Sequence, residues 1–317
     1  MTALVTGVAG FIGSHLAQTL LAEGHQVRGV DCFTPYYDPR AKRRNLEELA
    51  GEPGFEFAEA DLRVREPSGL LAGVDTVFHL AAQPGVRGSW AANFPEYAEH
   101  NLLATQRLLE GARAADVRRF VFASSSSVYG EAPHYPTSED VVPRPNSPYG
   151  ATKAAAEHLC NMYADNWGVP TVSLRYFTVY GPRQRPEMAI HRLVEAGMSS
   201  QPFTLFGTGN QVRDFTFVGD AVRATIDAAT AELSPGTVLN VAGGSSTTMN
   251  DLVTLVGDVL NTTVRVVRVM DQPGDVEREG GSTDRATALL GWKPLIDLRQ
   301  GVEQQARWQL RRAGVRV

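Results

Sequence analysis

Short apolar runs alternate with amphipathic stretches through the first half of the chain. Six of these runs have the length and composition of buried strands, and they lie at 2–6, 26–31, 55–59, 74–80, 118–123 and 170–176. Ile12, Leu16 and Leu20 form a helical stripe after the first run, and similar spacing predicts helices at about 41–50, 94–114 and 148–167. Strands that alternate with helices predict a parallel sheet with helices on both faces.

The pattern becomes irregular after about residue 176, where Pro and Gly interrupt short strands and helices. We expect residues 1–176 to form one domain and residues 177–317 to form mainly a smaller mixed α/β lobe. The apolar run at about 237–242 has the character of a strand that returns to the main sheet, so the boundary is not a single cut. The predicted fold is therefore α/β, a doubly wound parallel sheet with a smaller C-terminal lobe.

Composition and charge narrow the functional class. With 317 residues, 43% of them apolar and 21% charged, the chain has the balance of a soluble protein with a substantial core. It contains no apolar run of about 18 residues and no signal-type start, so we expect a cytoplasmic protein without a membrane span. A net charge of −5 disfavours nucleic-acid binding. Cys32 and Cys160 predict neither a disulfide framework nor a metal site.

A glycine-rich turn separates the first predicted strand from the helix that follows it. Gly7, Gly10 and Gly13 permit a tight turn and a close approach of the backbone to a pyrophosphate. The helix that begins near Phe11 and Ile12 adds free N–H groups and partial positive charge at the same point. This context predicts a dinucleotide site in a Rossmann-type fold; the alternative is a plain glycine turn.

A carboxylate at the end of the second predicted strand bears on which dinucleotide is bound. Asp31 lies about 20 residues after the turn, where an acidic residue accepts both hydroxyls of an adenosine ribose. It would repel a 2′-phosphate, which favours NAD over NADP. The basic run at 42–44 could in principle bind that phosphate, but we expect it to form a solvated helix face. Asp61 and Leu62 are placed to reach the adenine, or they belong to an ordinary exposed turn. Small residues after the fourth strand would let the backbone approach the cofactor, and they lie in the segment Leu80, Ala81 and Ala82.

Tyr149 and Lys153 are four residues apart on the predicted helix at 148–167. Ser147 and Pro148 have the form of a helix cap and first turn, so the phenol and the ammonium would share one helix face. A phenol titrates near pH ~10 and a neighbouring cation favours its ionised form, so the pair can remove a proton from a sugar or alcohol hydroxyl. Taken alone, the same spacing also fits a surface pair without chemistry.

Motifs along nearly the whole chain form one set. They are Thr6-Gly7-x-x-Gly10-x-x-Gly13, Asp31, Asp61-Leu62, His79-Leu80-Ala81-Ala82, Ser124-Ser125-Ser126-Ser127-Val128-Tyr129-Gly130, Tyr149-x-x-x-Lys153, Leu174-Arg175-Tyr176-Phe177 and Leu290-Gly291-Trp292-x-Pro294. Together they resemble the extended short-chain dehydrogenase/reductase family, specifically its NAD-dependent nucleotide-sugar epimerases and dehydratases. The resemblance implies that Tyr149 is the general base and that Lys153 lowers its pKa while binding the nicotinamide ribose. It also implies that Ser125 bonds the reacting hydroxyl and that Ser127 is a second polar position in the same loop.

The serine loop discriminates among the reactions of that family. Its 4,6-dehydratases carry an Asp-Glu pair at the positions of Ser126 and Ser127, and its UDP-glucuronate decarboxylases typically carry glutamate where Ser127 stands. Hydroxyls cannot act as a carboxyl acid–base pair, so both reactions are disfavoured here. The resemblance then implies epimerisation at C4, with NAD regenerated in every cycle.

Two stretches, 31–39 and 177–188, are similar to UDP-glucuronate 4-epimerases. Relatives that handle neutral sugars usually carry asparagine where Thr178 stands, and Arg185 suits a bidentate pair with a C6 carboxylate. We hypothesise that Thr178, Arg185 and the serine loop hold that carboxylate. The alternative is that Arg183 and Arg185 are solvated loop charges.

The resemblance also implies contacts with the UDP moiety. It places Arg213 on a phosphate and Asp275 on the uridine ribose, whereas Gln272 stands where many relatives carry arginine. Arg87 is a candidate contact of the pyrophosphate or sugar, and equally an ordinary surface arginine.

The sequence thus favours a UDP-glucuronate 4-epimerase that forms UDP-galacturonate with bound NAD. A UDP-glucose or UDP-N-acetylglucosamine 4-epimerase is the first alternative, and a decarboxylase, a dehydratase or a non-catalytic NAD-binding protein are others. The helices at 94–114 and 148–167 carry more apolar surface than one sheet face needs, and relatives pair these helices across a dimer interface. We therefore expect a homodimer.

Overall fold

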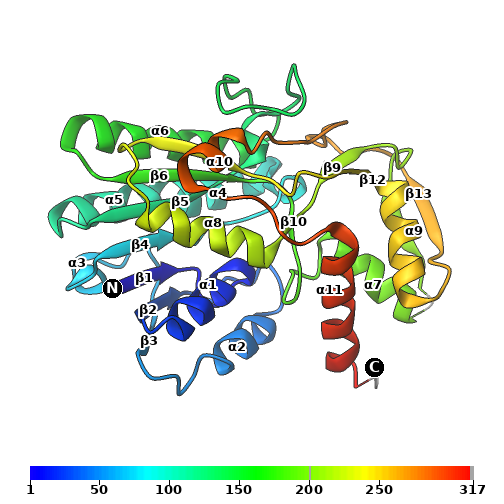
Figure 1. The fold of residues 1–317 in the computed structure, drawn as a ribbon, viewed down its shortest axis with the longest axis horizontal. Helices are drawn as coiled ribbons and strands as arrows, with labels where there is room; N and C mark the ends of the chain where they lie inside the picture. The colour runs from blue at the N-terminus through cyan, green and yellow to red at the C-terminus, as the bar shows by residue number, and fades with distance from the viewer. Residues whose placement is uncertain (200, 315–317) are drawn as a thin grey trace.

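A computed structural model describes residues 1–199 and 201–314. Its main sheet is parallel and has seven strands in the order β11-β6-β5-β4-β1-β2-β3 (Figure 1). The strands are β1 Thr2–Thr6, β2 Gln26–Asp31, β3 Phe55–Glu59, β4 Thr76–His79, β5 Arg119–Ser125, β6 Thr171–Tyr176 and β11 Thr237–Val241. The six strands expected in the first half are confirmed, and so is the doubly wound parallel fold.

The seventh strand comes from the second half of the chain. β11 pairs with β6 in parallel, with Thr237 opposite Val172 and Val241 opposite Tyr176. The apolar run expected to rejoin the sheet therefore does so, next to the strand that closes the first half.

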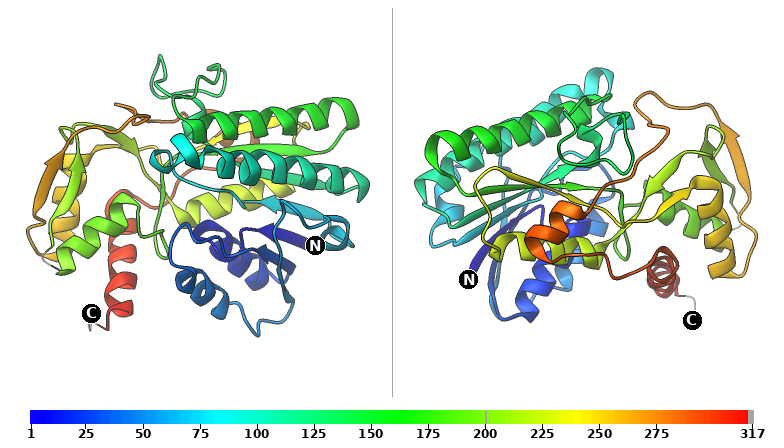
Figure 2. Two further views of the ribbon diagram at one scale, coloured as in Figure 1. Left: turned by 180° about the vertical axis from the view of Figure 1, so that it is seen from behind. Right: turned by 45° about the horizontal axis from the view of Figure 1, so that its top comes forward.

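Helices cover both faces of this sheet (Figures 1 and 2). Side chains alternate along each strand, so Ala3 and Val5 belong to one apolar core while Leu4 belongs to the other. One core includes residues of α1 (Phe11–Ala22) and α8 (Val218–Thr230), and the other includes residues of α5 (Ala104–Ala114) and α6 (Pro148–Trp167). The remaining helices of the first half are α2 Pro39–Glu47, α3 Ser68–Leu71 and α4 Phe94–Ala98.

The predicted helix at 148–167 is confirmed as α6. The Ser147 side chain accepts a hydrogen bond from Gly150 N at 3.1 Å, and Pro148 occupies the first turn. Gly168 ends the helix in the left-handed conformation, with φ at 67°. Both ends are therefore set by residues visible in the sequence.

The predicted helix at 94–114 is interrupted by a π-helical turn at Glu99–Leu103, between α4 and α5. Within this turn, the Asn101 side chain accepts from Gln83 N at 2.7 Å and donates to Gln83 O and to Thr152 Oγ1, each at 3.0 Å. These bonds join α4 and α5 to the loop after β4 and to the first turns of α6. Widened turns of this kind are frequent at functional sites.

A second lobe lies beyond the carboxyl ends of the main sheet (Figure 1). It contains three two-stranded pairs: β7 (Val179–Tyr180) with β10 (Thr216–Phe217), β8 (Phe203–Phe206) with β13 (Val266–Val269), and β9 (Val212–Asp214) with β12 (Ser246–Thr248). Its helices are α7 Ala189–Ser199, α9 Met249–Leu260 and α11 Leu298–Arg312, while α10 (Asp284–Leu290) packs beside β11 and α8. Within residues 1–199 and 201–314, no helix has the length and apolar character needed to cross a membrane.

Candidate active site

One cleft runs from the glycine turn after β1 to the segment between β13 and α10 in the second lobe. Side chains from both halves of the chain line it. Of the residues singled out from the sequence, those that line the cleft are Gly7, Gly10, Phe11, Ile12, Gly13, Asp31, Asp61, Leu62, Leu80, Ala81, Ala82, Ser125, Ser126, Ser127, Tyr149, Lys153, Thr178, Arg185, Arg213 and Asp275. The fold therefore brings almost the whole predicted set to one place.

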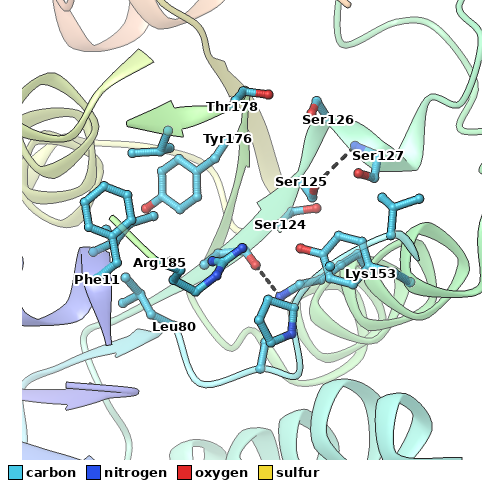
Figure 3. A pocket seen from close by; sticks show the side chains of 18 of the residues that line it. Phe11, Leu80, Ser124, Ser125, Ser126, Ser127, Lys153, Tyr176, Thr178 and Arg185 are labelled. Carbon is cyan, nitrogen blue, oxygen red and sulfur yellow. Dashed lines mark hydrogen bonds between the residues drawn. The ribbon is translucent and has the colours of Figure 1, made fainter. Parts of the chain in front are cut away.

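Tyr149 and Lys153 occupy the first two turns of α6 and both line the cleft. Figure 3 shows Lys153 in this position. Lys153 Nζ donates a hydrogen bond to Ala123 O at 2.8 Å and lies 4.9 Å from the centre of the Phe122 ring. The Tyr149 ring meets the Tyr97 ring edge-on, with centres 6.3 Å apart. The phenol and the ammonium are thus held by packing and by the backbone of β5, which limits their freedom to reorient.

Burial dominates the proton affinity of both groups. It raises the pKa of Tyr149, while the Ser125 hydroxyl and the Arg185 charge act in the opposite direction. It lowers the pKa of Lys153 to about 8. In the protein alone, the groups that favour the Tyr149 phenolate are therefore Ser125 and Arg185.

The serine loop follows the end of β5 and faces Tyr149. Ser125 Oγ accepts from Ser127 N at 3.2 Å, which begins the tight turn at Ser126–Val128 (Figure 3). The Ser126 hydroxyl donates to Glu279 Oε1 at 2.5 Å, and the Thr178 hydroxyl donates to Glu279 Oε2 at 3.0 Å. A carboxylate that sequence reasoning did not identify therefore lies behind two of the predicted substrate-binding hydroxyls.

The glycine turn has a shape that only glycine permits. Gly7 has φ at +69°, and a Cβ on it would lie 2.9 Å from Ala81 N. A Cβ on Gly13 would lie 2.3 Å from Gly7 O. Backbone segments therefore pack directly on one another here, which leaves a shallow cradle at the N-terminus of α1 that fits the pyrophosphate of a dinucleotide.

Asp31 ends β2 beside this cradle. Its carboxylate accepts from Ala9 N at 3.2 Å and from Phe33 N at 2.8 Å, which fixes it against the turn. It faces the cleft, where its remaining acceptor capacity suits ribose hydroxyls.

Lys42 corrects the expectation that residues 42–44 form a solvated helix face. Its side chain is buried, with Nζ donating to Thr34 Oγ1 at 3.0 Å and lying 3.8 Å from Asp31 Oδ1. Asn45, one turn further along α2, donates to Ala9 O at 3.0 Å, so this face of the helix packs on the glycine turn. Only Arg43 and Arg44 of the basic run are exposed. Lys42 and Asn45 are three residues apart, so they share one face of the helix. This spacing was the only sign in the sequence that the face is buried.

Asp61 and Leu62, which the sequence predicts to reach the adenine, line the cleft just after β3. Arg63 holds the Asp61 carboxylate at 2.7 Å, and this hydrogen bonding lowers the pKa of Asp61. Leu62 is buried, so only part of this turn is exposed. Across the cleft, Leu80 N and Ala81 N donate to Thr6 Oγ1 at 3.2 and 3.1 Å, which brings the strand ends of β1 and β4 together.

Arg183 and Arg185 have different environments. Arg185 lines the cleft and its Nε donates to Glu187 at 2.7 Å. Arg183 is buried, pairs with Glu48 and donates to Gln18 at 2.8 Å, so it fixes its loop to α1 and α2 and is not a solvated charge. The alternative that Arg183 and Arg185 are solvated loop charges is therefore wrong.

Arg87 and Asp275 pair with each other at 2.7 Å at the outer end of the cleft. The Arg87 guanidinium lies over the Phe206 ring, 3.8 Å from its centre, and only Asp275 of the pair lines the cleft. Arg213 also lines it, and its Nη1 donates to Val212 O at 2.8 Å. These side chains are in reach of a nucleotide that extends into the second lobe. Among the described residues, no group of three or more His, Cys, Asp or Glu is arranged to hold a metal ion.

The fold and the site define a Rossmann-type enzyme with a dinucleotide cradle and a Tyr–Lys pair on one helix. The profile of the NAD dependent epimerase/dehydratase family matches residues 3–242, and the chain belongs to this family. The expected cofactor, NAD, is thereby confirmed.

Similar proteins cover nearly the entire chain. The "Uncharacterized UDP-glucose epimerase YtcB" of Bacillus subtilis is 41% identical and spans 96% of both chains. A UDP-glucuronate 4-epimerase of Thermodesulfobacterium geofontis is 36% identical, over 96% of this chain and 95% of its own. The crystal structure of the UDP-glucuronic acid 4-epimerase of Bacillus cereus, in complex with UDP-glucuronic acid and NAD, has a TM-score of 0.94 at 39% identity, over 97% of this chain and 98% of that one.

We expect Gly13→Ala to lower both NAD content and stability. The added Cβ would approach the backbone of Gly7, so the turn must shift, at a cost of about 1–3 kcal/mol. Gly69→Ala is the matched control, because a Cβ there meets nothing within 4 Å. The measurements are the NAD released from purified protein and the Tm. Equal NAD content in the two variants would contradict the assignment of the turn.

Proposed function

We propose that the protein is a UDP-glucuronate 4-epimerase, which interconverts UDP-glucuronate and UDP-galacturonate. The observation that carries the proposal is the convergence of Tyr149, Ser125 and Arg185 in the cleft that also holds the NAD cradle. The serine loop offers hydroxyls where elimination or decarboxylation in this family uses carboxyl groups, so C4 inversion is the reaction that the site supports best.

Each catalytic residue has a defined task. Ser125 accepts and donates at the C4 hydroxyl, and Tyr149 removes its proton as the C4–H bond breaks. Lys153, anchored to Ala123 O, lines the same cleft, and we assign it to the nicotinamide ribose. NAD supplies a hydride acceptor when it is bound and returns the hydride to the opposite face of the sugar. Ser127 N bonds Ser125 Oγ and so orients the serine hydroxyl.

The substrate extends from the serine loop into the second lobe. We assign Arg185 and Thr178 to the sugar, Arg213 to a phosphate and Asp275 to the uridine ribose, with Ser126 and Ser127 on the sugar side. Residues 1–176 then bind mainly the cofactor, and residues 177–317 bind mainly the nucleotide sugar. Arg87 acts through its pair with Asp275.

A UDP-glucose 4-epimerase is the second candidate. It is favoured by one observation, the Glu279 carboxylate that faces Ser126 and Thr178, because a C6 hydroxyl is compatible with that environment and a C6 carboxylate is repelled by it.

The proposal is tested by assaying the purified protein without added NAD, because an epimerase regenerates its bound NAD in every cycle. Purified protein is incubated separately with the UDP derivatives of glucuronate, glucose and N-acetylglucosamine, and C4 inversion is followed by proton NMR. We expect UDP-galacturonate from UDP-glucuronate. UDP-pentose would indicate a decarboxylase, a 4-keto-6-deoxy sugar would indicate a dehydratase, and bound NAD without turnover would indicate a non-catalytic protein.

We also propose a homodimer that acts in the cytoplasm. Large apolar side chains of the helices around the π turn and α6 are exposed, with Leu103 at 45%, Met162 at 50% and Trp167 at 51%. Met162→Glu should therefore halve the mass measured by light scattering. Met270→Glu, in the second lobe and 86% exposed in the wild type, should leave the mass unchanged. Identical masses for both variants would place the interface elsewhere.

A further inference from the structure

Glu279 is held at a fixed position in the wall of the sugar pocket. Its backbone N donates to Val212 O at 3.0 Å, and Glu277 O accepts from Val212 N at 2.9 Å, so the segment is bonded to β9. On its other side, Gly280 O accepts from Thr137 N at 2.7 Å and Gly281 N donates to the Asp214 carboxylate at 3.3 Å. Four hydrogen bonds therefore fix the backbone of the segment that carries Glu279.

The side chain of Glu279 determines how its neighbours can bond to a sugar. It accepts from the Ser126 and Thr178 hydroxyls, so both hydrogens point toward the carboxylate. The two hydroxyl oxygens then offer only lone pairs to the pocket. Arg213 is the nearest cation, with Nε 3.9 Å from Glu279 Oε2, a separation too long for a hydrogen bond. This wall therefore accepts hydrogen bonds, and Arg213 offsets the negative charge of Glu279 only in part.

Arg185 gives another part of the same pocket a positive charge. It lines the cleft, and its charge acts on the Tyr149 phenol. In the view of Figure 3, Arg185 appears on one side of Ser125, and Ser126 and Thr178 appear on the other. The pocket therefore has a cationic wall at Arg185 and a wall backed by Glu279.

C4 inversion requires the sugar to meet both walls. The UDP group fixes C1 and Tyr149 fixes C4, so the 4-ketose must turn about the line from C1 to C4 to present its other face. That turn exchanges the edge bearing C2 and C3 with the edge bearing C6. Hydroxyls of C2 and C3 suit either wall, and so does a C6 hydroxyl. A C6 carboxylate suits Arg185 in one orientation and meets Glu279 in the other.

We propose that Glu279 is a specificity-determining residue that opposes C6 carboxylates and allows the enzyme to accept neutral UDP-hexoses alongside UDP-glucuronate. This inference rests on the epimerase function proposed above. The carboxylate disfavours one of the two orientations that a uronic acid must adopt, and it accepts hydrogen bonds from a neutral sugar in both.

The test compares Glu279→Gln with Glu277→Gln, which removes the same charge from the same segment at an exposed position outside the cleft. The ratio of kcat/KM for UDP-glucuronate to that for UDP-glucose is measured for each protein. We expect wild type to turn over both sugars, Glu279→Gln to raise the ratio about tenfold or more, and Glu277→Gln to leave it within twofold. Glu279→Asp keeps the charge and should retain the wild-type ratio.

Binding separates this inference from the epimerase assignment. The ratio of the Kd values for the same two sugars is measured by calorimetry in Tyr149→Phe and in the double variant with Glu279→Gln. A shift toward UDP-glucuronate in the double variant supports the role of Glu279 even if no sugar is turned over, which would overturn only the proposed reaction. The role of Glu279 would be overturned if the Kd values of both sugars changed equally. It would also be overturned if neither the Kd ratio nor the kcat/KM ratio changed.

Discussion

Replacing Tyr149 by phenylalanine should reduce C4 inversion by about 10²–10⁴-fold, the usual contribution of a positioned acid–base group. In the proposed reaction this hydroxyl removes the C4 hydroxyl proton, and Ser125 bonds to it. Burial raises the pKa of Tyr149. The Ser125 hydroxyl and the Arg185 charge oppose this effect and stabilise the phenolate. The rate of C4 inversion is measured by proton NMR, from the anomeric signals of the two UDP-sugars.

The matched control is Tyr97→Phe. The Tyr97 ring contacts the Tyr149 ring, but its hydroxyl donates to Pro84 O at 2.8 Å and has a structural role. This variant should lose about 1 kcal/mol of stability and keep most of its turnover. Bound NAD and UDP affinity should be unchanged in Tyr149→Phe, which distinguishes lost chemistry from lost folding. If Tyr149→Phe retains turnover comparable to that of Tyr97→Phe, the general-base assignment is wrong.

The sequence was most informative where local signals agree with the tertiary structure. α6 begins and ends as predicted because Ser147 caps it and Gly168 terminates it in a conformation that costs glycine little. The glycine turn was recognisable because its spacing lies between a strand and a helix, and the structure gives the reason, a backbone contact that excludes any Cβ at Gly13. Such features depend on a few consecutive residues and need no knowledge of the rest of the fold.

The parts that sequence reasoning missed depend on contacts between distant segments. The π turn at Glu99–Leu103 forms where Asn101 bonds to the loop after β4 and to α6, and no periodicity within the helix reveals this. Glu279 reaches the serine loop across 153 residues of sequence, from a segment without regular structure. Lys42 departs from the expected solvated helix face because Lys42 bonds to Thr34 and its neighbour Asn45 bonds to the glycine turn, contacts that the basic run alone does not reveal.

Replacing Arg185 by alanine should lower kcat/KM for UDP-glucuronate by about 30- to 5,000-fold, the range for removing one partner of a buried, hydrogen-bonded charge pair. NAD content should stay at the wild-type level, because Arg185 lies on the sugar side of the cleft. UDP-glucose turnover should fall less, since it loses only the contribution of Arg185 to the Tyr149 phenolate.

The same change should also release a by-product. The 4-keto form of a uronic acid is a β-keto acid, which loses carbon dioxide when its C5–C6 bond aligns with the ketone π system. A guanidinium that donates two hydrogen bonds to the carboxylate prevents this alignment. A lysine ammonium keeps the charge but cannot form the same planar, two-bond contact. We therefore expect UDP-pentose from Arg185→Ala, less of it from Arg185→Lys, and none from wild type, as measured by NMR. If the kinetics with UDP-glucuronate are unchanged in Arg185→Ala and no UDP-pentose forms, Arg185 does not hold the carboxylate and the assignment is wrong.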